Sequence, residues 1–167
     1  EGNGTLASST SLTEEDGTAE VVFTLDTDVQ HINKVKVYPA KNTNIWEEFE
    51  IRSVAGQVAR IRQIYPMNGR VTVGGDINIT VRCEDAYGNP VEDQNVLFEI
   101  VEGQGDLSSE NSISDGTTGE ASTYFSTSVL SNAVLRASLS ENPNISVLIN
   151  IEILPFPMLS VQDIWDR

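Results

Sequence analysis

Apolar and polar side chains alternate along much of the chain with a period of two residues, which is typical of half-buried β-strands. Residues 77–83, INITVRC, place four side chains on one face: Ile77, Ile79, Val81 and Cys83. Segments 19–25, 96–100 and 145–153 alternate in the same way. Stretches rich in Gly, Asn, Asp and Pro separate these segments, and such residues form turns. No segment has a convincing helical period, so the pattern predicts an all-β fold, an antiparallel sandwich of short strands.

An internal repeat divides the chain. The segment EGNGTL at residues 1–6 returns as EGQGDL at residues 102–107. The correspondence continues at offsets of about 100 residues through five further pairs: Gly17 and Gly119, Phe23 and Phe125, Val35 and Leu135, Phe49 and Ile149, Ile51 and Ile151. This period is the length of one immunoglobulin-like (Ig-like) sandwich. We therefore predict tandem modules: the C-terminal half of an Ig-like domain at 1–53, a complete domain at 54–153, and a linker or tail at 154–167.

Five short motifs follow one another in the predicted complete domain. They are a Gly-initiated strand at Gly75, the turn DAYGNPV at 85–91, a Val-x-Phe strand at 96–98, a Gly-x-Gly-x-Leu segment at 103–107 and a Gly-x-Ala strand start at 119–121. Their order resembles the bacterial Ig-like modules of the invasin and intimin type. Members of this family are mostly tandem stalks on bacterial surface proteins, where they hold an adhesive tip away from the cell.

That resemblance covers residues 58–153 in full and 1–51 in part. It implies a location outside the cell or on the bacterial surface. The partners that it implies are neighbouring Ig-like modules of the same parent chain and, as further candidates, a strand-exchanged copy of the chain and a host or surface receptor.

Charge narrows the range of partners. The chain has 25 acidic and 10 basic residues, a formal net charge of −15. Such a surface repels nucleic-acid phosphates and anionic lipids. No apolar run approaches the roughly 20 residues that span a bilayer. We therefore expect no nucleic-acid partner and no membrane insertion of this segment.

The inventory of acid–base groups is too thin for catalysis. The single histidine, His31, lies in the segment DVQHINK, where we expect an exposed loop. The single cysteine, Cys83, alternates onto the inner face of a core strand, which favours a small buried hydrophobe over a reactive thiol. No glycine-rich loop leads from a strand to a helix to bind phosphate. The sequence predicts a protein that is not an enzyme, with no catalytic residues and no cofactor.

The acidic corner EDAYGNPVED contains four weak candidates for calcium ligands: Glu84, Asp85, Glu92 and Asp93. Calcium takes 6–8 oxygen ligands. The chain has no D-x-D-x-D-G loop, however, and acidic residues are common in solvated turns. We therefore predict no metal site, with calcium at this corner as the weaker alternative.

Three aromatic residues are candidates for a ligand or an interface: Trp46, Tyr87 and Trp165. Trp46 alternates onto the outer face of its strand, where it could stack on a sugar or, as we favour, contact a neighbouring module. Tyr87 lies in the turn. Trp165 follows Pro155 and Pro157 in a tail that leads to another module or docks as a strand on a neighbour.

A half-domain exposes apolar surface and unpaired strand edges. A longer parent chain, strand exchange with another copy or the C-terminal tail could cover them, and we favour the first. The sequence thus predicts a non-enzymatic structural or adhesion module, a semi-rigid spacer in a tandem Ig-like array of a bacterial cell-surface or secreted protein. The alternatives are a carbohydrate- or protein-binding sandwich and a fibre subunit assembled by strand exchange.

Overall fold

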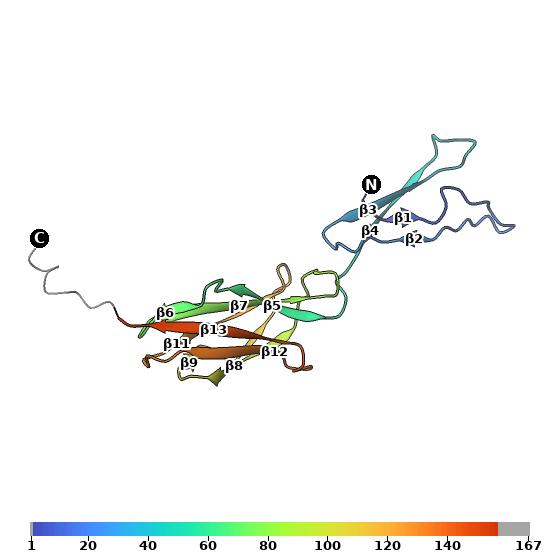
Figure 1. The fold of residues 1–167 in the computed structure, drawn as a ribbon. Coiled ribbons are helices and arrows are strands. Elements are labelled where there is room, and N and C mark those ends of the chain that lie inside the picture. The colour runs from blue at the N-terminus through green and yellow to red at the C-terminus, as the bar shows by residue number, and fades with distance from the viewer. Residues whose placement is uncertain (1, 157–167) are drawn as a thin grey trace, which may run out of the picture. The chain divides into compact units, whose positions relative to one another are not determined.

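The computed structural model describes residues 2–156 and divides the chain into two units, Glu1–Ala55 and Gly56–Arg167 (Figure 1). The described residues form strands and no helix, which confirms the predicted all-β class. Accordingly, none of them belongs to a helix that could span a bilayer.

The second unit is a sandwich of two sheets. The sheet with the order β5-β7-β11-β9 contains β5 (Arg60–Tyr65), β7 (Asp76–Glu84), β11 (Glu120–Ser126) and β9 (Asp106–Leu107). The sheet with the order β10-β8-β12-β13-β6 contains β10 (Asn111–Ile113), β8 (Asn95–Glu102), β12 (Ala133–Leu139), β13 (Ser146–Leu154) and β6 (Arg70–Thr72).

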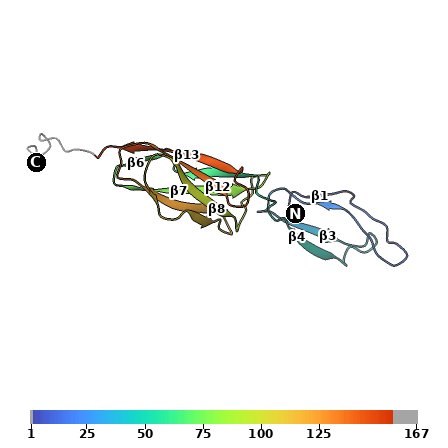
Figure 2. The same cartoon turned by 90° about the horizontal axis from the view of Figure 1, so that it is seen from below.

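The chain changes sheet between β5 and β6, which ties the two layers together. β5 pairs antiparallel with β7, whereas β6 pairs parallel with the end of β13 (Figure 2). The connection needs Gly69, because a Cβ there would collide with the carbonyl oxygen of Asn150 on β13. A strand that crosses between the sheets closes one side of an Ig-like sandwich.

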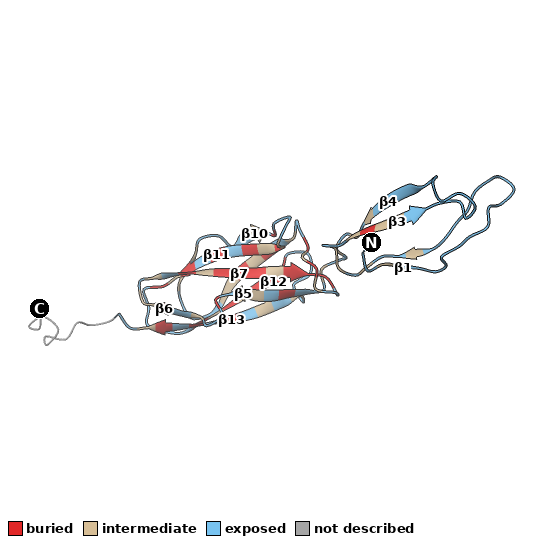
Figure 3. Ribbon diagram, turned by 90° about the horizontal axis from the view of Figure 1, so that it is seen from above, coloured by how far each residue is buried: buried red, intermediate tan, exposed pale blue. Residues whose placement is uncertain are grey.

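The core of the second unit lies between its two sheets, where the buried stretches of the strands face one another (Figure 3). Its largest fully buried apolar side chains are Phe98, Phe125, Ile79, Leu135, Ile149, Ile151, Val81 and Val96. Cys83 is also fully buried. The inward set that the alternation predicts for residues 77–83 is confirmed. Burial of each large side chain stabilises the fold by about 1.5–3 kcal/mol.

The first unit contains two antiparallel strand pairs: β1 (Thr5–Leu6) with β2 (Phe23–Thr24), and β3 (Ile32–Val37) with β4 (Glu47–Arg52). The strand β2 is shorter than the alternation predicts. Only two residues of the segment 19–25 are in this strand. Leu12, which lies between β1 and β2, is 91% exposed. In the second unit the corresponding strand β11 pairs with β7 along its whole length, and no such partner lies along β2 among the described residues.

The strand pairing of the first unit has the same register as that of the second. The equivalent pairs are Leu6↔Phe23 and Leu107↔Phe125, Val35↔Phe49 and Leu135↔Ile149, Asn33↔Ile51 and Ala133↔Ile151. A shift of one residue in either unit would reverse the faces of every side chain. The repeat in the sequence is therefore a repeat of strand pairing.

Two repeated glycines show why the segment EGxG recurs. Gly2 and Gly103 have φ angles of +98° and +90°, which side chains with a Cβ rarely adopt. A Cβ on Gly2 would lie 2.9 Å from the Cα of Asn33, and one on Gly103 would lie 2.8 Å from the Cα of Ala133. Both positions thus require glycine for two reasons: the positive φ angle and the close approach of a neighbouring backbone atom.

Truncation of the core should destabilise the second unit selectively. Phe125→Ala removes a ring that is fully buried between the sheets, and we expect a loss of about 3–5 kcal/mol in the free energy of unfolding. Denaturant unfolding followed by circular dichroism measures it. The control is Tyr124→Ala on the same strand, because Tyr124 is 52% exposed and its loss should cost about 0.5 kcal/mol or less. Equal losses in both variants would contradict this core.

Candidate functional site

The first unit has an apolar groove of about 520 Å³ between its strand pairs. We call it the open apolar face, and its principal side chains are Leu6, Phe23, Val35, Val37, Phe49 and Ile51. They come from all four strands of the unit, because alternation in each strand places its apolar residues on the same side. The first unit therefore presents an uncovered sheet interior.

The second unit shows how unusual this exposure is. Phe49 is 53% exposed, whereas its equivalent Ile149 is fully buried. Val37 is 50% exposed, whereas Ala137 is fully buried. Figure 3 shows the same contrast between the mostly pale strand β4 and the red stretches of β7. The open apolar face of the first unit thus has the composition of a core without the covering strands.

The first unit also contains a buried polar side chain with an unsatisfied hydrogen-bond donor. Asn33 on β3 is fully buried, and its Oδ1 accepts a hydrogen bond from the backbone N–H of Gly4 at 3.0 Å. Its Nδ2 has no acceptor among residues 2–156. A buried donor without a partner costs about 1–3 kcal/mol. Asn33 is not among the site residues predicted from the sequence, although its place in the repeat, equivalent to that of the small Ala133, distinguishes it there.

The turn DAYGNPV of the second unit is organised by Asp85. This buried carboxylate accepts hydrogen bonds from the backbone N–H groups of Tyr87 and Asn89 at 2.9 Å, of Gly56 at 3.0 Å, and from the side-chain amide of Asn89 at 2.9 Å. Burial alone would raise the pKa of Asp85, but these donors outweigh it and lower the pKa to about 2. Gly88, with φ +91°, completes the turn.

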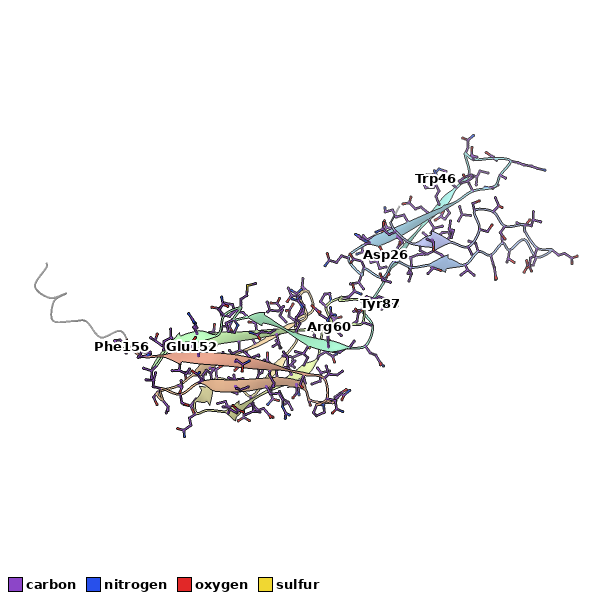
Figure 4. The ribbon with its side chains drawn as sticks, in the orientation of Figure 1. Asp26, Trp46, Arg60, Tyr87, Glu152 and Phe156 are labelled. Atoms are coloured by element: carbon purple, nitrogen blue, oxygen red, sulfur yellow. The ribbon has the colours of Figure 1, made fainter. Side chains whose placement is uncertain are left out.

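Glu84, the neighbouring carboxylate, is held by two arginines of β5. Its oxygens lie 2.7 Å from Nε of Arg60 and 2.6 Å from an η nitrogen of Arg62 (Figure 4 labels Arg60). Burial would raise the pKa of Glu84, but the hydrogen bonds from Arg62 and Arg60 hold it below its usual value. Protein donors therefore surround both buried calcium candidates.

The other two candidates for calcium ligands, Glu92 and Asp93, are exposed. In the described part of the chain, no three His, Cys, Asp or Glu side chains come close enough together to hold a metal ion. Asp93 has a φ angle of +58°, so it serves as a turn residue in the left-handed region. The acidic corner works through hydrogen bonds and ion pairs of the protein itself.

The aromatic candidates Trp46 and Tyr87 lie in different units. Trp46 precedes β4 and is 53% exposed, and the Nζ of Lys36 lies 4.2 Å from the centre of its ring, a cation–π contact (Figure 4). Tyr87 is 73% exposed at the turn of the second unit. Trp165 lies outside the described residues, as does most of the predicted tail.

The two residues with catalytic potential have structural partners. His31 is exposed, and its Nδ1 lies 2.8 Å from Oδ2 of Asp26, whose hydrogen bond raises the pKa of the imidazole. Cys83 is fully buried, and burial raises the pKa of its thiol to about 11, against a smaller lowering effect of a hydrogen bond with Ser114. The Cys83 thiol is therefore protonated at neutral pH.

Two sheets joined by a crossing strand, with the parallel pair of β6 and β13, define the second unit as an immunoglobulin-like β-sandwich. No family model matches the chain, and no curated protein matches it in sequence. Intimin and invasin, whose modules the turn pattern resembles, are among the solved structures that are similar to it.

The intimin structure is a C-terminal 282-residue fragment in complex with the intimin-binding domain of the translocated intimin receptor. It is 21% identical over 59% of this chain and 33% of that chain, with a TM-score of 0.47. Invasin, a bacterial integrin-binding protein, is 19% identical over 87% of this chain and 29% of that chain, with a TM-score of 0.45. A glycosyl hydrolase of family 2 from Bacteroides cellulosilyticus is 19% identical over 81% and 19%, with a TM-score of 0.47.

The chain spans about a third of the length of the intimin fragment, and less of the other two proteins. These similarities assign no activity, ligand or partner to it.

Removal of the Asp85 charge should change how stability depends on pH. The pKa of Asp85 falls from 3.8 to about 2 on folding, so its stabilisation is fully present above about pH 5 and is lost as the pH falls towards 2. We expect Asp85→Asn to destabilise the second unit by about 2 kcal/mol at pH 7 and by much less near pH 2. Denaturant unfolding across this range measures the difference. Asp93→Asn is the control, and parallel pH curves for Asp85→Asn and the unmodified chain would refute the role of this carboxylate.

Proposed function

We propose that this chain is a stretch of a tandem Ig-like array that acts as a semi-rigid spacer in a bacterial cell-surface or secreted adhesion protein. In this proposal residues 1–53 are the C-terminal half of one domain, residues 54–153 are the next domain, and residues 154–167 lead onward. The observation that carries it is the identical strand register of the two units. The bacterial and surface setting rests on the resemblance of the turn motifs.

A short connection between the units supports the semi-rigid character. The hydroxyl of Ser53 donates a hydrogen bond to the carbonyl of Asp26 in the first unit at 2.9 Å. The N–H of Gly56 donates to Asp85 in the second unit at 3.0 Å. Only residues 54–55 lie between these two anchored positions. Because a chain spans at most about 3.5 Å per residue, two residues limit how far apart the two anchored positions can move.

The edge of the second unit is suited to bear tension. β6, which follows β5 in the chain, runs parallel to the last strand β13, with Arg70 opposite Glu152 and an ion pair of 2.7 Å between them. Tension can pull the N-terminal end of β6 away from the C-terminal end of β13. Because the two strands are parallel, this tension loads all the hydrogen bonds between them in shear, so that they share the load. A spacer held between two neighbours needs this kind of resistance.

Carbohydrate binding is the second candidate function, and the exposure of Trp46 is the observation that favours it. An exposed indole ring is a stacking platform for a sugar. However, the ammonium of Lys36 lies over the Trp46 ring, which leaves only the other ring face for stacking.

The spacer proposal predicts a narrow distribution of distances between the units. Spin labels at Lys41→Cys and Asn142→Cys, both exposed positions, report this distribution by pulsed electron resonance, while the buried Cys83 stays unlabelled. We expect a narrow distribution that broadens several-fold when Gly-Ser-Gly-Ser is inserted between Val54 and Ala55. If the unmodified chain gives a distribution as broad as the insertion variant, it is not a semi-rigid spacer.

The carbohydrate alternative is tested with a glycan panel. The spacer proposal predicts no saturable binding to any glycan for the unmodified chain and for Trp46→Ala alike. Saturable binding that Trp46→Ala abolishes and Tyr38→Ala, a change at another exposed aromatic residue of the same unit, preserves would establish the alternative instead.

A further inference from the structure

We propose that the open apolar face of the first unit is the binding site for two antiparallel strands with the chemistry of β7 and β8, which enter the chain from the amino-terminal side of Gly2. One strand pairs with the segment 19–25 and the other pairs with β3. This inference rests on the proposed repeat and specifies what completes it: the occupant, its register and its side chains.

The second unit shows what covers the equivalent face. There, β7 pairs with β11 and places three inward side chains against it, in the pairs Ile77↔Phe125, Ile79↔Thr123 and Val81↔Ala121. β8 pairs with β12 in the pairs Phe98↔Ala137 and Ile100↔Leu135. β7 thus extends the sheet of β11, and β8 extends the sheet of β12, at the edges that correspond to those of β2 and β3.

The same positions in the first unit define the register of the occupant. Phe125, Thr123 and Ala121 correspond to Phe23, Val21 and Ala19, and Leu135 and Ala137 correspond to Val35 and Val37. Among the described residues β3 pairs only with β4, and β2 pairs only with β1, so one edge of each strand is open. A complete antiparallel ladder on both edges requires a strand along each of them.

The occupant must also match the side chains that it meets. Its inward positions have to be apolar and alternate with polar residues, as Ile77, Ile79 and Val81 do in β7.

The conformation at Gly2 points to the side from which the occupant arrives. In the second unit β8 ends at Glu102, and the chain continues directly into Gly103 with φ +90°. Gly2 has the same conformation, φ +98°, and packs against Asn33 as Gly103 packs against Ala133. A strand along β3 can therefore run into Gly2 without a connecting loop.

A second copy of the chain is a poorer occupant. Its own β7 and β8 are buried in its second unit, so donating them would open that core. Two open apolar faces packed against each other would bury side chains but leave the edges of β2 and β3 unpaired. Strands with the chemistry of β7 and β8 satisfy the apolar side chains and the edges together.

A graft tests this proposal in the full chain. A copy of residues 56–101 is placed directly before Glu1, so that its last strand leads into Gly2 as β8 leads into Gly103. Hydrogen exchange of the amides in residues 19–25 and of the β3 amides that face away from β4 is then compared with that of the unextended chain. We expect exchange of these amides to slow by about 100-fold or more in the grafted chain and binding of an apolar dye to fall.

Two variants of the grafted copy serve as a matched pair. Ile79→Asp changes an inward side chain and should abolish the added protection, whereas Asn78→Asp changes the adjacent half-exposed residue and should preserve it. Unchanged exchange in the grafted chain, or equal protection in the two variants, would overturn the proposal. So would a dilute unextended chain in which the β3 amides that face away from β4 are already protected.

Sedimentation separates the remaining outcomes. If the unextended chain protects β3 only as it dimerises, a second copy is the occupant and the proposal is wrong. The test is also distinct from that of the spacer. A broad spin-label distribution would remove the spacer role and leave the graft result standing, whereas a graft without effect would remove the completing strands and leave the spacer role open.

Discussion

One constraint governs both units: a strand with alternating side chains has an apolar face, and a second layer of strands must cover it. In the second unit the sheet β5-β7-β11-β9 supplies this layer for β12 and β13, and Ile149 and Ala137 are fully buried. In the first unit the register is the same, yet Phe49 and Val37 are half exposed. The pairing within a sheet thus forms from local alternation, whereas burial depends on strands that lie elsewhere in the sequence.

Residues that suggest chemistry in the sequence turn out to stabilise the structure. Glu84 is neutralised by Arg60 and Arg62, and Asp85 binds the backbone of its own turn. The Cys83 thiol is sealed inside the core. The bond from Gly56 to Asp85 gives the acidic turn a further role, because it fixes the point at which the chain enters the second unit. Asp85 therefore links the stability of the turn to the stiffness that we expect of a spacer.

The proposed spacer and the proposed completing strands follow from the same repeat but depend on different parts of it. Stiffness depends on the two residues between Ser53 and Gly56 and on the shear-loaded edge of β6 and β13. Completion depends on the open apolar face and on the open edges of β2 and β3. An array in which each module is closed by strands of its own and joined by a short linker transmits force along paired strands.

The sequence alone determined the all-β class, the inward set of β7 and the repeat, because these depend on alternation and on glycines such as Gly2 and Gly103 that tolerate no Cβ. Tertiary structure decided the rest. The segment 19–25 has the alternation of a full strand but pairs only at Phe23–Thr24, since the length of a strand depends on its partner. The partners of Asp85 and the missing partner of Asn33 likewise follow from which distant backbone groups the fold brings near, and a linear pattern carries no such information.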